Sequence, residues 1–190
     1  GNIHLHIDLI AGLPYEDFDS FAKSFNQAYD INANVIQLGF LKLLKGSTLE
    51  KEKEKYNYRS WDYAPYQVVS CDSISYNDLL ELKKCEDAVE RLLNSGKFPL
   101  TVPYLINATG ILPFDFFYKF GSKSPSLEKY ASLLFDYFTQ NYNIDKSSLR
   151  DVMVKDRIIT DNTGRLFGFT HIPDTKFKTI TTALRQQTVN

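Results

Sequence analysis

The sequence predicts a fold of the α/β class, α+β overall, with a strand–helix–strand unit at its start and a mainly helical remainder. Over residues 3–44, alternation with period two gives way to helical spacing and then to an almost continuous apolar run. Beyond residue 61, apolar residues recur three and four positions apart behind residues that favour helix starts. Two strands joined by one helix form a βαβ unit, whose crossover is right-handed in nearly all proteins.

Residues 3–10 are expected to form the first strand, because β-branched and leucine side chains alternate with polar ones. Successive side chains of a strand point to opposite faces. One face carries His4, His6, Asp8 and Ile10, and the other carries Leu5, Ile7 and Leu9. The segment Ala11–Pro14 breaks the alternation and ends the strand.

A helix is expected next, with Pro14 near its first turn and acidic residues at its positive end. Its apolar stripe consists of Phe18, Phe21, Ala22, Phe25 and Tyr29. Residues 35–44 follow and are apolar on both faces, which is typical of a buried parallel strand.

Three regions are expected along the chain. Residues 1–49 hold the βαβ unit, residues 50–60 form a charged, solvent-exposed linker, and residues 61–190 form a mainly helical accessory domain.

Cap residues place the helices of the accessory domain. Ser75 and Asp78 are expected to form a capping box, and Asn94–Gly96 to end that helix. Ser124–Pro125 and Asp145 are expected to begin two further helices. A turn is expected at Asp161–Gly164.

Aromatic residues make up 14% of the chain, and five of them lie within residues 114–120. So many large apolar side chains must be buried, either against this chain or against a surface outside it.

The composition excludes several classes of protein. The chain has 190 residues, 22 basic and 23 acidic side chains and 43% hydrophobic residues, which is typical of a globular domain. A net charge of −1 argues against a duplex nucleic-acid binder. No apolar run reaches the length of a membrane span, and two cysteines favour a reducing compartment. We therefore expect a cytoplasmic protein with no nucleic-acid or membrane partner.

The metal-binding potential of the chain is small. His4, His6 and Asp8 share one strand face, and two imidazoles so spaced can chelate one ion if other segments add ligands. The only other histidine is His171, so no metal site is expected. Cys71 and Cys85 do not form a Cys-x2-Cys pair, and Cys85 falls on an apolar stripe as a core residue.

Two segments resemble the end of a radical S-adenosylmethionine (SAM) barrel. These are His6–Pro14 and Gln37–Leu49, which flank the expected helix. In members similar to oxygen-independent coproporphyrinogen oxidase, the fifth strand reads Asp-Leu-Ile-x-Gly-Leu-Pro-Gly-x-Thr, and the sixth ends in a Gly-Thr-Pro-Leu-like turn. Further on, Trp61, Ala64–Tyr66 and Asn94–Gly96 resemble the C-terminal extension of cobalamin-binding radical SAM proteins, a domain of unknown function. The resemblance implies that residues 1–49 are the last βαβ unit of a partial (β/α)6 barrel.

The resemblance also implies a set of cofactor-binding residues. The family's fifth strand carries a Gly-x-Ile-x-Gly-x-x-Glu pattern that lines the adenosine pocket, and it maps onto Asp8, Ile10 and Gly12. Ile10 would contact the adenine, and Gly12 would let the backbone approach the ligand closely. The last position departs from the pattern, because Tyr15 stands there and Glu16 follows.

The parent that this resemblance implies is a cobalamin-dependent radical SAM enzyme, an iron–sulfur oxidoreductase or a methyltransferase-like enzyme. Its cofactors would be SAM, a [4Fe–4S] cluster and cobalamin. The family's cluster is held by Cys-x3-Cys-x2-Cys, which this sequence lacks. The chain is therefore expected to be a C-terminal portion that binds no cofactor by itself and is catalytically inactive.

The expected partners are the missing N-terminal part of the same polypeptide and a second copy of the chain, as a homodimer. Two alternatives stay open. One is a stand-alone protein-interaction module, and the other is a metal-dependent hydrolase that uses His4, His6 and Asp8.

Overall fold

The chain divides into two compact units by its internal contacts. The computed structural model describes residues 3–121, 126–160 and 182. The first unit comprises residues 1–94 and 111–122, and the second comprises residues 95–110 and 123–190. The fold is mixed α/β, as the sequence predicts. The domain boundaries expected at residues 49 and 60 stay a prediction.

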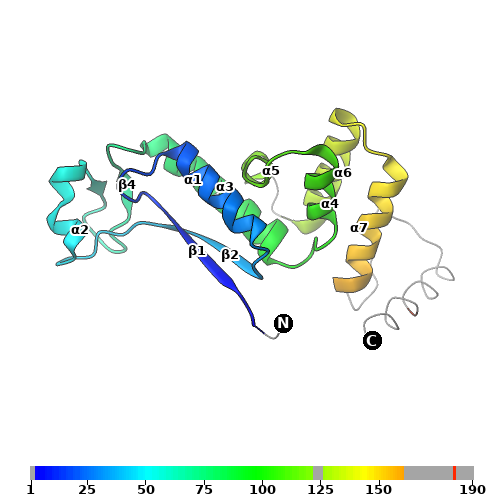
Figure 1. The fold of residues 1–190 in the computed structure, drawn as a ribbon, viewed down its shortest axis with the longest axis horizontal. Helices are drawn as coiled ribbons and strands as arrows, with labels where there is room; N and C mark the ends of the chain where they lie inside the picture. The colour runs from blue at the N-terminus through cyan, green and yellow to red at the C-terminus, as the bar shows by residue number, and fades with distance from the viewer. Residues whose placement is uncertain (1–2, 122–125, 161–181, 183–190) are drawn as a thin grey trace. The chain divides into compact units, whose positions relative to one another are not determined.

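The first unit begins with a strand, a helix and a second strand, and continues through small elements into longer helices (Figure 1). Its elements are β1 (His6–Ala11), α1 (Phe18–Asp30), β2 (Val35–Phe40), α2 (Thr48–Lys51), the 3-10 helix η1 (Lys53–Tyr56), β3 (Arg59–Ser60), β4 (Val68–Ser70), α3 (Tyr76–Val89), the π-helix η2 (Glu90–Asn94) and α5 (Pro113–Phe120). In the described part of the second unit the elements are α4 (Thr101–Thr109), α6 (Leu127–Asn141) and α7 (Lys146–Thr160).

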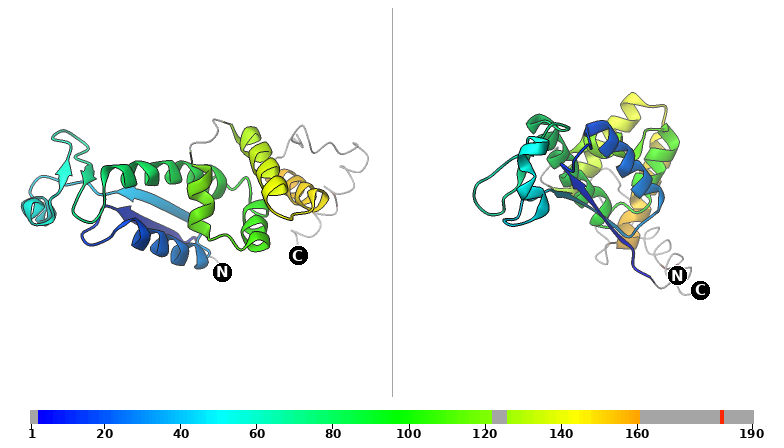
Figure 2. Two further views of the ribbon diagram at one scale, coloured as in Figure 1. Left: turned by 90° about the horizontal axis from the view of Figure 1, so that it is seen from above. Right: turned by 60° about the vertical axis from the view of Figure 1, so that its left-hand side comes forward.

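Strands β1 and β2 pair in parallel, which confirms the βαβ unit. Ile7, Leu9 and Ala11 lie opposite Ile36, Leu38 and Phe40. On this face α1 contacts β1 and α3 contacts β2 (Figure 2). His6, Asp8 and Ile10 face the other side of the sheet and are exposed. The alternation in the sequence therefore predicts both faces of β1 correctly.

Helix α1 begins at Phe18, later than the expected start near Pro14. Asp17 is the N-cap, since its side chain accepts a hydrogen bond from the backbone N–H of Ser20 at 2.8 Å. The Ser20 hydroxyl in turn accepts from the Asp17 N–H at 2.9 Å. Tyr15 has a positive φ of 66°, which is incompatible with a helix. The placement of Pro14 in the first turn was therefore wrong.

The aromatic segment expected to need burial forms helix α5, which packs against α1 and α3. Four of its phenylalanines are at most 2% exposed: Phe114, Phe116, Phe117 and Phe120. Asn26 of α1 accepts a hydrogen bond from the backbone N–H of Phe114 at 2.8 Å. Full burial of one such side chain contributes about 1.5–3 kcal/mol. The aromatic residues of this segment thus join α1 of the βαβ unit to α3.

Residues that follow the βαβ unit form hydrogen bonds along the outer edge of β2, which is the edge that faces away from β1. The Asn94 side-chain amide, at the end of η2, accepts from the Ile36 N–H at 3.2 Å and donates to the Ile36 carbonyl at 3.0 Å. Further along, Val68 N–H donates to the Leu41 carbonyl at 2.8 Å. Beyond Phe40 the chain leaves the parallel ladder, so β2 is shorter than the strand expected over residues 35–44.

The second unit is held by contacts of α4 and α6 with α7. Its buried stripe on α6 includes Tyr130, Ala131, Leu134 and Phe138. Asp145 caps α7 by accepting from the Ser148 N–H at 2.8 Å. Asp156 of α7 is fully buried and accepts from the N–H groups of Leu100 and Thr101, each at 2.8 Å. A carboxylate from α7 therefore caps the start of α4.

Other expectations have mixed outcomes. The capping box of Ser75 and Asp78 is confirmed, and Cys85 lies in the core. The charged run contains α2 and η1 rather than an extended linker, although no residue of either helix is buried. Ser124–Pro125, the turn at Asp161–Gly164 and His171 lie outside the described residues.

Candidate functional site

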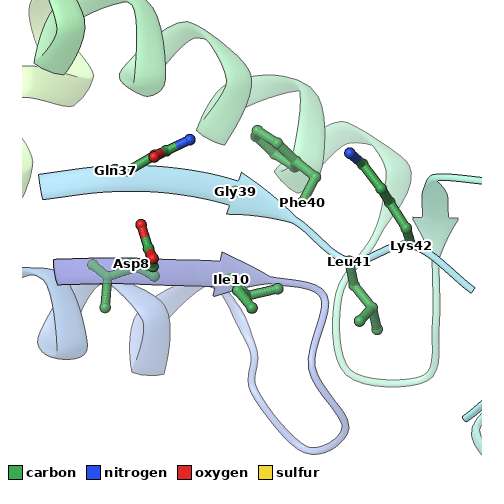
Figure 3. Close-up of a pocket in the computed structure, with 8 residues that line it drawn as sticks. Asp8, Ile10, Gln37, Gly39, Phe40, Leu41 and Lys42 are labelled. Carbon is green, nitrogen blue, oxygen red and sulfur yellow. The ribbon is translucent and has the colours of Figure 1, made fainter. Parts of the chain in front are cut away.

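An open groove of about 440 Å3 lies along the ends of β1 and β2 (Figure 3). It is lined by Asp8, Leu9, Ile10, Gln37, Gly39, Phe40, Leu41 and Lys42. Asp8 lies opposite Gln37, and Ile10 lies opposite Gly39, in the register of the two strands. These four residues belong to the face that the helices do not cover.

Two of the three expected cofactor-binding residues, Asp8 and Ile10, line this groove. The Ile10 side chain is 42% exposed, so it offers an apolar contact that is not used within the described residues. Gln37, Gly39 and Lys42 line the groove as well, and the sequence analysis did not identify them. The parallel register of the two strands would have revealed Gln37 and Gly39, because residues opposite each other share a face.

Gly39 lets backbone form part of the groove surface. A Cβ placed there would lie 3.5 Å from the Leu9 carbonyl oxygen and 4.0 Å from Ile10 Cγ1, which are ordinary contacts. The absence of a side chain at this position is therefore not required by packing. It leaves space on the exposed face of the sheet.

Gly12 does not line the groove. Its φ is +94°, and a Cβ there would meet Leu41 Cβ and Val68 Cγ1 at 3.6 Å. A residue with a side chain rarely adopts this φ, so the turn itself explains the glycine. Whether Gly12 also contacts a cofactor stays a prediction.

Tyr58 holds the loop that follows β1. Its hydroxyl donates a hydrogen bond to the Gly12 carbonyl at 2.8 Å, and only 8% of the residue is exposed. Burial raises the pKa of Tyr58, with smaller contributions from Cys71 and Tyr56. The phenol therefore stays protonated at physiological pH and remains a hydrogen-bond donor.

The charged groups of the groove lie on β1 and just beyond the end of β2. Asp8 Oδ1 is 3.1 Å from His6 Nε2 on the exposed face of β1. Lys42 lies beyond the end of β2, beside Gln67. The groove thus offers an acidic group, an amide, an apolar surface and a basic group to a ligand.

Metal ligands are few in the described part of the chain. Within residues 3–121 and 126–160, no three histidine, cysteine or acidic side chains are grouped to hold a metal ion. His6 and Asp8 pair with each other, and His171 lies outside the described residues.

The cysteines do not suit an iron–sulfur cluster. The whole chain has two, Cys71 and Cys85, whereas a cluster of the radical SAM type takes three. Cys85 is fully buried, and burial raises the pKa of its thiol to about 12. A buried, protonated thiol is a core residue and not a metal ligand.

Across the described residues, the helices fall short of the length and apolarity that crossing a lipid bilayer demands.

Comparison with known proteins identifies the C-terminal three quarters of the chain. A family described as "Protein of unknown function (DUF4080)" matches residues 54–190. No curated protein matches the sequence. The matched segment includes Tyr58, Val68 and Asn94, the residues that contact the β1–α1 loop and the outer edge of β2. The chain therefore belongs to the DUF4080 family.

Proposed function

We propose that this chain is the C-terminal portion of a cobalamin-binding radical SAM enzyme and that its groove forms one wall of the SAM site. The observation that carries the proposal is the exposed groove on a parallel βαβ unit, on the face opposite its helices. In a barrel of parallel strands, that face lines the interior, and ligands bind at the carboxyl ends of the strands. The DUF4080 family, which is associated with cobalamin-binding radical SAM proteins, also supports it.

The groove residues fit part of a SAM molecule. Ile10 offers an apolar surface to the adenine, and Gly39 permits close approach to the backbone. Asp8 and Gln37 offer hydrogen-bond acceptors and a donor to polar groups of the ligand. SAM cleaved by a reduced cluster supplies radical chemistry, and the two cysteines of this chain do not fit that cluster. The cluster would come from another part of the polypeptide.

Because the proposed SAM site takes its cluster from another part of the polypeptide, we expect the isolated 190-residue chain to bind SAM poorly. The groove is one open wall, and most of the enclosing surface would come from other strands. A loss of about 4 kcal/mol moves a dissociation constant from micromolar to about millimolar. Calorimetric titration of the isolated chain should detect no micromolar binding.

The decisive experiment uses the complete open reading frame that contains this chain. The purified protein is reconstituted with iron and sulfide under anaerobic conditions and given SAM and dithionite. Formation of 5′-deoxyadenosine supports the proposal. Gly39→Val, which fills the groove, should reduce product formation by about tenfold. Thr48→Val, on the exposed helix α2 outside the groove, is the control. A reading frame without a cysteine triad and a protein without 5′-deoxyadenosine formation would refute it.

One observation favours the interaction module as a second candidate. Leu5 and Ala11 direct their carbonyl groups towards the β2 segment, so the alternate residues His6, Asp8 and Ile10 direct their backbone groups to the opposite edge. Unpaired strand edges recruit other strands. A stop codon directly before this region would favour this candidate over the enzyme. The hydrolase hypothesis is tested by the zinc and iron content of the purified chain.

A further inference from the structure

We propose that the exposed segment Trp61–Tyr66, here called the aromatic turn, is a binding site for a flat aromatic ring that carries a negative charge. The turn joins β3 to β4 in the first unit and lies beside the residues that follow β2. This inference does not depend on SAM or on a cluster.

The first observation is a stacked pair of aromatic rings on the surface. The Trp61 and Tyr63 rings lie with their centroids 5.6 Å apart and their planes 10° from parallel. Trp61 is 41% exposed and Tyr63 is 65% exposed. A pair in the core would be buried, so packing does not explain this arrangement. The proposed ligand would stack on the face of a ring that points away from its partner.

The second observation is that the backbone holds this turn in place. The Trp61 N–H donates to the Gln67 carbonyl at 3.1 Å, and the Tyr66 N–H donates to the Tyr63 carbonyl at 2.8 Å. The Leu43 N–H donates to the Tyr66 carbonyl at 2.9 Å, which ties the turn to the end of β2. Rings held on an ordered backbone lose less entropy on binding than rings on a loose loop.

Backbone strain accompanies this order. Tyr66 has a φ of +57°, a conformation that non-glycine residues seldom adopt. Such strain persists where the surrounding structure enforces it, and it is concentrated at ligand sites.

The third observation is a positive charge beside the turn. Lys45 is exposed and has no ion-pair partner among the described residues. Lys45 Nζ lies 5.5 Å from the centroid of the Tyr66 ring. Asp62 lies within the turn and opposes an anion, so its carboxylate should weaken binding. Lys45 favours an anionic ring over a neutral one.

The test uses the whole 190-residue chain and three small probes. Trp61 is its only tryptophan, so tryptophan fluorescence reports on this turn alone. The probe is 2-naphthoate, which is flat and anionic. Its amide, 2-naphthamide, keeps the ring without the charge, and cyclohexanecarboxylate keeps the charge without the aromatic ring. Calorimetry confirms each dissociation constant.

We expect saturable binding of 2-naphthoate, about tenfold tighter than binding of either other probe. Tyr63→Leu and Lys45→Gln should each weaken it severalfold, and Asp62→Asn should strengthen it. The matched controls are Tyr76→Leu and Lys53→Gln, exposed residues outside the turn. Unchanged melting temperatures show that the variants fold.

Three results would each overturn the proposal: no saturation with 2-naphthoate, equal affinity for the amide, or equal affinity of the Tyr63→Leu and Lys45→Gln variants. Because the chain tested holds no cluster, these results are independent of 5′-deoxyadenosine formation by the complete enzyme. Lys45 is exposed, so Lys45→Gln should fold normally. This variant keeps the proposal testable even where Tyr63→Leu fails to fold.

Discussion

The hydroxyl of Tyr58 lies 2.8 Å from the carbonyl oxygen of Gly12, 46 positions earlier in the chain. Tyr58 belongs to the segment that matches the DUF4080 family, and Gly12 directly follows the first strand. One buried hydrogen bond thus fixes the loop after β1 to the segment that precedes β3. The part of the family region that contains Tyr58 therefore lies in the same compact unit as the βαβ unit.

Tyr58→Phe should lower the free energy of unfolding by about 1–2 kcal/mol, because the Gly12 carbonyl loses its donor in a buried place. The measurement is urea unfolding, together with hydrogen exchange of the amides that follow Gly12. Tyr15→Phe, at a residue that is 79% exposed, is the matched control and should change neither. Equal unfolding curves for Tyr58→Phe and the wild-type chain would contradict this role.

Gly12 and Gly39 should respond oppositely to substitution. Gly12→Ala and Gly12→Val should both lower the melting temperature, since φ is +94° at Gly12. Gly39→Ala should leave the melting temperature unchanged or raise it, because its Cβ meets ordinary contacts in a strand. In the complete enzyme Gly39→Ala should still weaken SAM binding. A stable Gly12→Val protein with selectively impaired SAM binding would restore Gly12 as the ligand contact.

Asp156→Ala should destabilise the second unit by about 2–4 kcal/mol, because the backbone N–H groups of Leu100 and Thr101 lose their acceptor. Asp151→Ala, at an exposed residue of the same helix, should cost far less. Thermal unfolding of the two variants measures the difference. Similar melting temperatures would show that the cap is unimportant.

The same carboxyl group should make stability depend on pH. Burial raises the pKa of Asp156 above its ordinary value of 3.8, although hydrogen bonds from Thr101 and Leu100 act against the rise. The unfolded carboxyl is the stronger acid. The stability that comes from protonation of this group is therefore complete below pH 3.8 and is lost as the pH rises through the raised value. Relative to the wild-type chain, Asp156→Asn should lack this decline; an identical pH profile would disprove it.

The 190-residue chain should self-associate through the edge of β1. The backbone groups of Asp8 point to that edge, so Asp8→Pro removes a donor there without breaking the bonds to β2. Light scattering at tens of micromolar should give a dimer mass for the wild-type chain and for Asp8→Asn, which changes charge alone. Asp8→Pro should be monomeric. A monomeric wild-type chain would show that this edge is covered in another way.

Local signals in the sequence predicted much of the first unit. Alternation located β1, and the apolar stripes located α1 and α3, because each pattern reports burial of one face. The predicted capping box and the apolar stripes rest on residues a few positions apart. Helix α4 and the β3–β4 pair were missed, since neither has a strong periodic pattern and β3 has only two residues.

Of the eight residues that line the groove, the sequence analysis named Asp8 and Ile10, through the resemblance to the radical SAM family. Gln37 and Gly39 join them only through the pairing of β2 with β1, and Lys42 lies beyond the end of β2. The contact of Tyr58 with Gly12 carries no local signal at all, since nothing in the sequence near either residue requires it. Long-range contacts of this kind depend on tertiary packing, which periodicity does not report.

The side-chain amide of Asn94 forms the two hydrogen bonds that a peptide unit of a neighbouring strand would form with Ile36. It accepts from the Ile36 N–H and donates to the Ile36 carbonyl. Its reach depends on where η2 ends, because one residue more or less would rotate the side chain around the helix axis and away from Ile36. A single deletion in this π-helix would therefore uncover a second edge and allow strands to add from both sides. One side chain at the end of η2 thus occupies the backbone groups of Ile36 on the edge of β2 that faces away from β1.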